Sequence, residues 1–599
     1  MLWTTLVASI GLTTLPLATI YPQTPSGEPV VIEGVRNSLL NYDEYLGIPF
    51  AAPPVGDLRL ANPQDPTWNV TTFSASSYSP ACLQAPSEAN DAYGQSEDCL
   101  YLNVITPLGI DYTQQSVPVM VWIYGGAFTS GTASIYNSTV LMATAQATDR
   151  PIIFVSINYR LGVFGFPYVC IAYRLEDRSY ACRSGKEVAQ AGIANLGMKD
   201  VIKSLEWVQE HIWAFGGDAG QVTIAGQSAG AILVSLLYLQ PNQSLFNSAI
   251  MESGSQSVAP IAPTAEFWQG AFDLIQNYTN CSAPVTTQSN TSVSRRDSTD
   301  LPPEITCLKY VPAEELLKAQ LAVKNTTEYG ASFIFAPSID GDLIPASPHE
   351  LLAEGKFSMK PFISGDVYDE GTAFVPAAYT NYTQQELPFV IEILQPIPAS
   401  NATVLEEVGE YYPNIPALGS PFGTGNETFG LPPQYKQLAA IFGDATFQAN
   451  RRWFLDNANQ YGLNETWSYL FGRAVPGTPP RLGVPHSSEL PYVFGAPQLQ
   501  ALGGGLAGLP FGQPNYTSGD AMLSKQVVDY WINFVYYLDP NGDYSGNETI
   551  WPTYTEEKNM LFMNVSNITV IPDTYRESQM DFFLSNPKTF NYKRWLGLE

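Results

Sequence analysis

A serine framed by two glycines is the first indication of chemistry in this sequence. Residues 226–230 read GQSAG, which fits the pattern G-x-S-x-G. The run before them, VTIA, is typical of a strand, and the run after the serine, AGAILVSLLYL, is typical of a helix. In that context the chain turns sharply, the glycines let the turn close, and the serine Oγ is pushed out of the sheet. We therefore predict a nucleophile elbow with Ser228 as nucleophile and with Gly226, Gln227 and Gly230 shaping the turn.

A serine hydroxyl becomes a good nucleophile when a base takes its proton, and a histidine oriented by a carboxylate is the usual base. The sequence contains three histidines. His211 lies in an expected helix and His349 lies in SPHELL, which resembles the start of a surface helix, so both are interpreted as structural or solvated. His486, in RLGVPHSSELPYVFG, lies on a loop near the end of the chain, where the base is expected.

The carboxylate should lie between the serine and the histidine if the chain order is serine, acid, histidine. The segment PFISGDVYDEGTAF (361–374) is a buried-strand pattern followed by Asp366, Asp369 and Glu370. A carboxylate at the end of a strand can reach the site, whereas one on an exposed helix cannot. Spacing does not choose among these three residues.

Backbone N–H donors for a tetrahedral oxyanion are the fourth requirement of this chemistry. The segment VMVWIYGGAFTSG (119–131) has a Gly-Gly pair at the end of an expected buried strand, upstream of the elbow. A glycine-rich turn in that place is typical of an oxyanion hole. The alternative interpretation is a plain tight turn.

Strands and helices that could position these residues alternate along the chain. Short apolar runs rich in β-branched or aromatic residues predict buried parallel strands, at 117–124, 151–159, 221–226 and 361–367. Apolar residues at helical spacing predict helices, at 200–212 and 520–538. This alternation indicates an α/β protein with a doubly wound sheet, whose site lies at the carboxyl ends of the strands.

The composition restricts the class of protein. The chain has 599 residues, of which 45% are hydrophobic and 12% aromatic, so it can bury a large core and is not disordered. The absence of repeats and composition shifts favours one large domain. The formal net charge of −28, without a Lys/Arg cluster, argues against nucleic acid and anionic membrane surfaces as partners.

Several features indicate secretion. Residues 1–18 are apolar, too short to span a bilayer comfortably, and end near small residues, so we predict a signal peptide followed by a domain at 19–599. No later segment has the length of a membrane span, so release from the cell is expected. Fifteen N-x-S/T sequons are candidate glycosylation sites. They are Asn69, Asn137, Asn242, Asn277, Asn280, Asn290, Asn325, Asn381, Asn401, Asn426, Asn464, Asn515, Asn547, Asn564 and Asn567.

Six cysteines fit a secreted protein with disulfides. Their order suggests three local pairs, Cys82–Cys99, Cys170–Cys182 and Cys281–Cys307, although six cysteines allow 15 connectivities. Zinc binding is the competing interpretation, and neither a CxxC motif nor paired histidines support it.

Taken together, these motifs resemble the type-B carboxylesterase/lipase family of the α/β-hydrolase fold, which includes secreted fungal lipases and, more distantly, cholinesterases. The resemblance runs from about residue 28 to about residue 540. Its landmarks are YLGIPFAAPPVGDLRL, SEDCLYLNV, VWIYGGAF, SINYRLGVFGF, WAFGGDAGQVTIAGQSAGA, SIDGDLIP, GDVYDEGTAF and GVPHSSELPYVFG. The resemblance implies a mostly parallel central sheet flanked by helices, with long loop and helical insertions.

The resemblance also implies roles for individual residues. It gives Ser228 as nucleophile, Glu370 as acid and His486 as general base, with the backbone N–H groups of Gly126, Ala127 and Ala229 as oxyanion donors. It implies family disulfides at Cys82–Cys99 and Cys281–Cys307, whereas Cys170–Cys182 is peculiar to this chain. Two structural ion pairs are implied, Arg59 with Glu97 and Arg160 with Asp200. No metal and no organic cofactor is expected.

Three positions depart from the family pattern. Gln227 stands where most members have glutamate, which removes a buried charge behind the serine. Ala127 replaces the last glycine of a GGG triplet, and its methyl group narrows the part of the site that is expected to hold the acyl group of the substrate. The Cys82–Cys99 loop encloses 16 residues and no tryptophan, so it lacks both the ring that binds choline in cholinesterases and the long apolar flap of the lipases.

The expected function is therefore hydrolysis of carboxylic esters through an acyl-enzyme on Ser228, acting on a small-molecule or lipid-like ester. The first alternative is a lipase or sterol esterase acting on long-chain esters. A second alternative, from another class, is a cholinesterase-like binding protein without catalysis. The rate is expected to fall as the pH drops through a histidine pKa of roughly 6 to 7.

Overall fold

The structure is a computed structural model of the 599-residue chain. It describes residues 16–21, 28–38, 40–87, 90–110, 115–167, 172–174, 180–182, 193–241, 243–257, 274–281, 303–325, 335–376, 380–394, 402–501, 514–543 and 549–590. Most of the predicted signal peptide, Cys170, and the sequon residues Asn242, Asn290, Asn401 and Asn547 lie outside the described residues.

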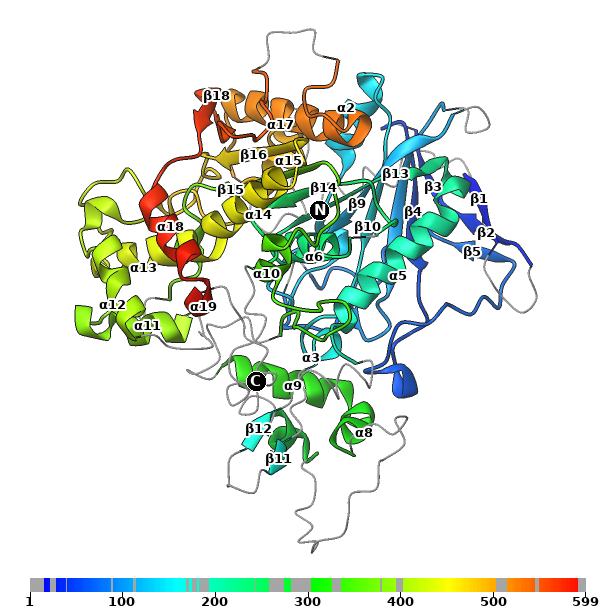
Figure 1. Ribbon diagram of the computed structural model, residues 1–599. Helices are drawn as coiled ribbons and strands as arrows, with labels where there is room; N and C mark the ends of the chain where they lie inside the picture. Colours follow the sequence, from blue (N-terminus) through cyan, green and yellow to red (C-terminus); the bar gives the residue numbers. More distant parts are fainter. Residues whose placement is uncertain are drawn as a thin grey trace, which may run out of the picture.

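A large central sheet forms the middle of the molecule (Figure 1). Its eleven described strands run, from one edge to the other, in the order β18 (Asn567–Pro572), β17 (Asn559–Asn564), β16 (Thr466–Phe471), β15 (Phe362–Val367), β14 (Ser248–Glu252), β13 (Gly217–Gln227), β9 (Val117–Ile123), β10 (Ile153–Ile157), β8 (Tyr101–Pro107), β4 (Tyr42–Pro49) and β3 (Val35–Asn37). The runs expected as strands at 117–124, 151–159, 221–226 and 361–367 are strands β9, β10, β13 and β15.

The middle of this sheet is parallel. All pairings from β10 through β9, β13, β14, β15 and β16 to β17 are parallel, and the remaining pairings, at the two edges, are antiparallel. Parallel strands place their carboxyl ends at one edge of the sheet, so the segments that follow β9, β13 and β15 are brought to the same side. These are the segments that carry the predicted site residues.

Helices pack on the sheet and extend beyond it. The helix expected at 200–212 is α5 (Leu196–His211), and the one expected at 520–538 is α17 (Ser518–Tyr537). In Figure 1, α17 lies beside α2 (Thr139–Ala147), while α5 and α6 (Ala229–Tyr238) each contact β13 in the middle of the sheet. The other α-helices are α3 (Gly162–Gly165), α8 (Pro303–Tyr310), α9 (Ala313–Lys324), α10 (Pro348–Ala353), α11 (Leu387–Leu394), α12 (Ala402–Tyr411), α13 (Gln434–Gly443), α14 (Ala449–Gln460), α15 (Leu490–Val493), α16 (Ala496–Ala501), α18 (Glu577–Ser585) and α19 (Pro587–Phe590).

Short strands complete the structure outside the large sheet. They are β1 (Leu17–Ile20), β2 (Val30–Glu33), β5 (Thr72–Ser74), β6 (Ala81–Cys82), β7 (Gln95–Ser96), β11 (Ala172–Arg174) and β12 (Tyr180–Cys182). Strand β1 pairs with β2, and Ala18 is buried opposite Ile32. The segment near the expected cleavage position therefore lies in a strand in the uncleaved chain.

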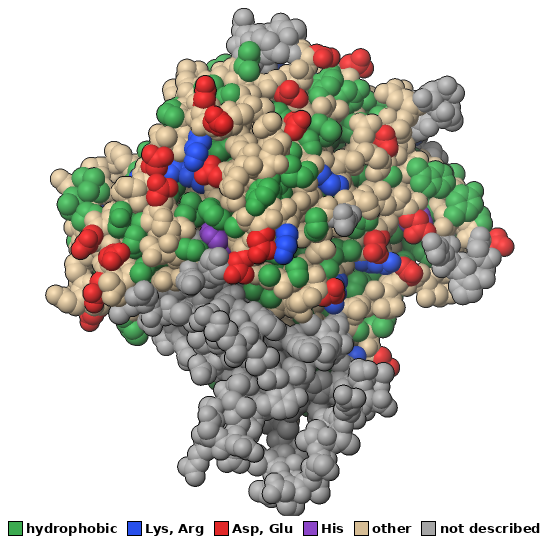
Figure 2. Space-filling view, in the orientation of Figure 1, with side chains coloured by type: hydrophobic (Ala, Val, Ile, Leu, Met, Phe, Trp, Pro, Cys, Tyr) green, Lys and Arg blue, Asp and Glu red, His purple; other side chains and the backbone are tan. Residues whose placement is uncertain are grey.

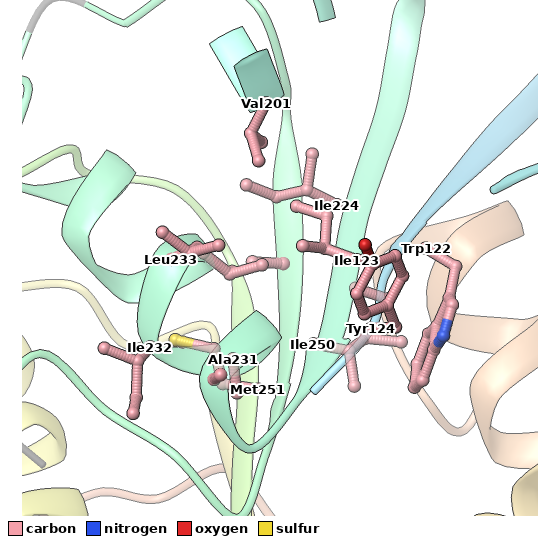
Figure 3. Close-up of a cluster of buried hydrophobic side chains, with 14 of the residues drawn as sticks. Trp122, Ile123, Tyr124, Val201, Ile224, Ala231, Ile232, Leu233, Ile250 and Met251 are labelled. Atoms are coloured by element: carbon pink, nitrogen blue, oxygen red, sulfur yellow. The ribbon is translucent and has the colours of Figure 1, made fainter. Parts of the chain in front are cut away.

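Apolar side chains fill the space between the sheet and the helices beneath the expected elbow. Figure 3 shows Ile123 of β9, Ile224 of β13, Leu233 of α6 and Met251 of β14 in one cluster, and each of these side chains is fully buried. Burial of an aliphatic side chain of this size stabilises the folded state by about 1.5–3 kcal/mol. The cluster therefore fixes β13 against α6, and with them the turn that joins the two elements.

A buried ion network holds the carboxyl end of β15 to the C-terminal part of the chain. Arg451 of α14 is almost fully buried and donates to Asp366 at 2.8 Å and to Asp573 at 2.7 Å. It also donates to Ser468 Oγ at 2.6 Å on β16. Arg452 donates to the same Asp573 carboxylate at 2.9 Å. Burial of a charge is costly unless it is paired and hydrogen-bonded, and here both conditions are met.

Arg451→Met is expected to lower the free energy of unfolding by about 3–5 kcal/mol, because it removes the buried cation that pairs with both Asp366 and Asp573. The measurement is urea unfolding of the purified variant beside wild type. Lys525→Met is the matched control, since the Lys525–Asp529 pair spans one turn of α17 and its lysine is exposed. That change should cost at most about 1 kcal/mol. Equal losses of unfolding free energy in the two variants would contradict a stabilising role for the buried network around Arg451.

Candidate active site

The turn between β13 and α6 has the geometry of a nucleophile elbow. Ser228 follows the last residue of β13 and adopts φ 54° and ψ −123°, a strained conformation for a residue with a side chain. A Cβ on Gly226 would lie 2.7 Å from the carbonyl carbon of Gly230, and a Cβ on Gly230 would lie 1.9 Å from the Ile123 oxygen. Both flanking positions therefore require glycine. The Ser228 N–H donates to the Glu252 carbonyl at 2.8 Å, which ties the turn to β14.

The Gly-Gly segment after β9 forms a second turn beside the elbow. Gly126 has φ 117° and Ala127 has φ 53°, and the Gly126 carbonyl accepts from the N–H groups of Thr129 and Ser130. Within the part of the chain that the structure describes, no acceptor pairs with the N–H groups of Gly126 or Ala127. A Cβ on Gly125 would lie 2.8 Å from the Ser228 Cβ, so this turn and the serine are in close contact. The N–H of Ala229 is one of the first in α6, where helix N–H groups have no partner within the helix.

His486 and Glu370 form a hydrogen-bonded pair. The Nδ1–H of His486 donates to Glu370 Oε2 at 2.6 Å. The second carboxylate oxygen, Oε1, accepts from the Val367 N–H at 2.9 Å, at the end of β15. With Nδ1 protonated toward the carboxylate, Nε2 carries the free lone pair, which is the form that a general base needs.

The structure separates the three carboxylates between which the sequence could not choose. Asp366 is paired with Arg451, as described above. Asp369 accepts from Ser420 Oγ at 2.9 Å, from the Phe422 N–H at 2.8 Å and from the Val484 N–H at 2.9 Å, so it anchors loops. Glu370 faces His486.

Aromatic rings surround the histidine. The rings of Phe374 and Phe447 each lie 5.0 Å from the His486 ring, and Phe374 stacks on Phe447 at 5.5 Å. Phe447 belongs to a π-helical turn, Asp444–Gln448, inserted between α13 and α14. Turns of this kind often occur at functional sites. Gln448, in the same turn, donates to the Val367 carbonyl at 2.9 Å and thereby braces the strand end that positions Glu370.

The protonation of His486 reflects two opposing influences. Burial disfavours the imidazolium and is the largest of them, but the charge of Glu370 and its hydrogen bond outweigh it, so the pKa of His486 is raised above 6.5. A base works when it is neutral, and a raised pKa keeps it protonated to higher pH. Activity should therefore be lost as the pH falls through a value above the 6.5 of an unperturbed histidine.

The acid limb of kcat/KM is accordingly expected to have its midpoint above pH 6.5. The measurement is kcat/KM for a soluble ester from about pH 4.5 to pH 9, because this quantity reports the groups of the free enzyme. A rate that stays flat down to about pH 4 would contradict a role for His486 as the base.

Sequence reasoning missed two buried glutamates behind the pair. Glu252, at the end of β14, accepts from Trp531 Nε1 at 2.7 Å, and its pKa is raised well above 4.5 by burial and by the charge of Glu489. Burial, together with the charge of Glu370, raises the pKa of Glu489 to about 8. With a pKa of about 8, Glu489 is mainly protonated at neutral pH. Glu489 stands three residues after His486 in the same motif, HSSE, which was the available signal.

The other two histidines lie away from this constellation. His211 closes α5, and its pKa is lowered by burial. His349 is buried in α10 and stacks on Trp453 with ring centroids 4.1 Å apart. The expectation of a surface helix at His349 was wrong, because this helix packs against α14, whereas its structural interpretation agrees with the stacking.

The Cys82–Cys99 loop is fixed to the turn after β9. The disulfide is present, as is Cys281–Cys307, and Cys170 of the expected Cys170–Cys182 pair lies outside the described residues. Gln84 is fully buried, donates to the Gly131 carbonyl at 2.9 Å and accepts from the Gly131 N–H at 2.9 Å. The two expected ion pairs are also present, Arg59–Glu97 at 2.5 Å and Arg160–Asp200 at 2.7 Å.

The described sequon asparagines are exposed, with one exception. Asn564 is half-buried at the end of β17, and its Nδ2 donates to the Gly472 carbonyl at 2.7 Å. Glycosylation replaces one of the two hydrogens on this nitrogen with a sugar, which would have to fit beside the Gly472 carbonyl, so Asn564 is the least suitable of the described candidate acceptors.

Comparison with known sequences gives matches along nearly the whole chain. The Carboxylesterase family matches residues 31–583. A protein described as Secreted lipase 1, from Botryotinia fuckeliana (strain B05.10), is 34% identical over 582 residues, which cover 92% of this chain and 90% of that protein. Lipase 2 of Geotrichum candidum is 33% identical over 593 residues, covering 91% and 92%. A secreted triacylglycerol lipase of Gibberella zeae is 32% identical over 588 residues, covering 92% and 88%.

Comparison with solved structures gives the same picture. The crystal structure of Aspergillus niger EstA superposes with a TM-score of 0.75 at 27% sequence identity, covering 94% of this chain and 98% of that chain. This agreement, together with the parallel sheet and its flanking helices, confirms the predicted α/β-hydrolase fold.

Proposed function

The chain belongs to the carboxylesterase family and is a carboxylic ester hydrolase, and from this premise we propose that it is a secreted serine hydrolase acting through an acyl-enzyme on Ser228. The observation that carries the proposal is the pair formed by His486 and Glu370, which leaves Nε2 unprotonated beside the elbow that bears Ser228.

In this mechanism His486 takes the proton of Ser228 through Nε2 while the serine Oγ attacks the ester carbonyl carbon. Negative charge develops on the carbonyl oxygen, and the N–H groups of Gly126, Ala127 and Ala229 stabilise it. His486 then gives its proton to the leaving alcohol. A water molecule, deprotonated by the same nitrogen, releases the acid and restores the serine. Glu370 remains a carboxylate throughout and stabilises the imidazolium.

The substrate class proposed first is soluble carboxylic esters rather than emulsified lipids. Interfacial activation requires an apolar flap that moves, whereas the short loop closed by Cys82–Cys99 is held by the two Gln84–Gly131 hydrogen bonds. Asp91 in the same loop accepts from the Ser87 N–H and from Gln95 Nε2. The second candidate is a lipase or sterol esterase acting on long-chain esters, which is favoured by the names of the three relatives described above, each of which is called a lipase.

Hydrolysis of a p-nitrophenyl ester series from acetate to palmitate separates these two candidates. We expect the highest kcat/KM at short acyl chains, and no jump in rate as tributyrin is raised through its solubility limit, because the loop that would open is bonded in place. If kcat/KM were highest for palmitate and the rate jumped at the solubility limit of tributyrin, the lipase assignment would replace the esterase assignment. Gln84→Ala, which releases the loop from Gly131, is the companion variant and should make any interfacial response larger.

Secretion is the proposed location, with residues 1–18 as signal peptide and residues 19–599 as one domain. Relatives named as secreted support it, as do the two disulfides, since disulfides persist in oxidising compartments. Among the described residues, no helix combines the length and apolar character needed to cross a bilayer. N-terminal sequencing of the protein recovered from the culture medium tests this proposal, and retention in the cell of an uncleaved chain would contradict it.

A small-molecule or lipid-like ester is the only partner proposed. On the face shown in Figure 2, acidic side chains are scattered among neutral and apolar ones, and most of the Lys and Arg side chains lie close to acidic ones. A surface of this kind, with a net charge of −28, would repel the phosphates of nucleic acid. A non-catalytic binding protein is disfavoured because the nucleophile, acid and base positions are all filled.

A further inference from the structure

The residue before the expected nucleophile lies between the two halves of the candidate site. Gln227 ends β13 and is almost fully buried. On one side, a Cβ on Gly125 would come within 2.8 Å of Gln227 Oε1, so the amide lies against the Gly-Gly turn. On the other side, its Nε2 contacts the loop that carries His486.

Two contacts define what this amide does. Gln227 Nε2 donates a hydrogen bond to Ser487 Oγ at 2.8 Å. The same nitrogen lies 3.4 Å from Nε2 of His486, the ring nitrogen remote from Glu370. Ser487 adopts φ 72°, which is unfavourable for a residue with a side chain, and the hydrogen bond from Gln227 helps to hold it there.

The chemistry of the contact depends on the protonation of the ring. An amide nitrogen has hydrogens to donate and no lone pair to offer. When His486 is neutral with its proton on Nδ1, the lone pair on Nε2 is compatible with that donor. When Nε2 is protonated, two donors face each other, which disfavours the imidazolium. The amide therefore opposes the effect of Glu370, which favours the imidazolium from the other end of the ring.

Other ionisable groups near the ring do not replace this effect. Glu489 and Asp366 are the further acidic groups whose charge would act on His486. Asp366 is paired with Arg451, and the raised pKa of Glu489 keeps that carboxyl mainly neutral at pH 7. The rings of Phe374 and Phe447 cover other sides of the imidazole and carry no charge.

We propose that Gln227 is a positioning residue that anchors Ser487 and keeps Nε2 of His486 in its unprotonated, proton-accepting form, so that the enzyme works at lower pH than it would with a carboxylate in this place. The inference rests on the proposed function of His486 as general base. It assigns a role to the departure from the family's glutamate: the substitution removes a negative charge that would otherwise stabilise the imidazolium.

The test is the pH profile of kcat/KM for a soluble ester in wild type, Gln227→Glu, Gln227→Met and Ser487→Ala. A carboxylate close to Nε2 should move the acid limb of Gln227→Glu upward by about one pH unit, which is about a tenfold loss of kcat/KM on the acid side. Gln227→Met removes the donor without adding charge and should move the limb in the same direction by less. Ser487→Ala removes the anchor alone and should lower kcat while leaving the midpoint of the limb in place.

An acid limb that coincides in wild type and Gln227→Glu would overturn the inference, as would an equal displacement in Ser487→Ala. Circular dichroism and thermal unfolding show that each variant is folded before its profile is compared. Failure of the proposed function gives a different result: wild type would then show no acid limb in the histidine range, or Ser228→Ala would retain activity.

Discussion

Ser228→Ala is expected to lower kcat for p-nitrophenyl acetate by about 10⁶-fold, to the level that binding and the oxyanion donors alone can sustain. The methyl group fits the elbow, because the backbone there is set by Gly226 and Gly230 rather than by the serine side chain. The variant should therefore bind substrate and unfold at the same temperature as wild type. Stopped-flow and steady-state assays of both proteins give the comparison.

Ser235→Ala is the matched control for this variant. Ser235 lies on the same helix, α6, is fully buried, and donates to the Ile232 carbonyl within the helix at 2.8 Å. Its loss costs one hydrogen bond, about 1 kcal/mol of stability, and should leave kcat within about twofold of wild type. If Ser228→Ala kept more than about a hundredth of the wild-type rate, Ser228 could not be the nucleophile.

Glu370→Gln is expected to lower kcat by about 10⁴-fold. The amide has nearly the size of the carboxylate but cannot stabilise the imidazolium that forms when His486 takes the serine proton. It can also present its N–H₂ group to Nδ1 and so favour the wrong tautomer. The measurement is kcat for the same ester over a range of pH, so that a simple displacement of the acid limb is distinguished from loss of rate at the plateau.

Asp369→Asn separates the role of Glu370 from a general effect of acidic residues in this loop. Asp369 contacts loop backbone and Ser420 rather than the histidine. Its loss should reduce stability and lower kcat/KM by about tenfold or less. Comparable losses of kcat in Glu370→Gln and Asp369→Asn would show that the loop, and not the Glu370 carboxylate, supports the reaction.

Much of the scaffold could be predicted from the sequence because its signals are local. The strands β9, β10, β13 and β15 are continuous apolar runs, as expected of parallel strands that are buried on both faces of the sheet. The glycines of the elbow could also be predicted, because their need comes from contacts within a few residues of the turn and with the adjacent strand. With three histidines in the chain, the choice of base followed by elimination.

Other features depend on contacts between residues far apart in sequence. Asp366, Asp369 and Glu370 lie within five residues of each other, and what separates them is their partners, Arg451, Val484 and His486. No local pattern could show those pairings. The resemblance to a family supplied Glu370 where spacing alone left the choice open.

Contacts between distant parts of the chain also explain why the roles of several other residues could not be predicted from the sequence. Gln227 could be seen as an exception to a pattern, but its contacts with Ser487 and His486 join positions about 260 residues apart. His349 was misplaced for a similar reason, since the ring that buries it, Trp453, is more than a hundred residues away. Gln84 donates a hydrogen bond to the Gly131 carbonyl, 47 residues further along the chain, and no local sequence pattern could predict that contact.

Covalent labelling of the nucleophile tests the central claim most directly. Wild type is inactivated with paraoxon, and the site of the diethyl phosphoryl group is found by peptide mass spectrometry. We predict one phosphoryl group per chain, on the peptide that contains Ser228, appearing in step with loss of esterase activity and absent from Ser228→Ala. A label on another residue, or complete inactivation with Ser228 unmodified, would contradict the account.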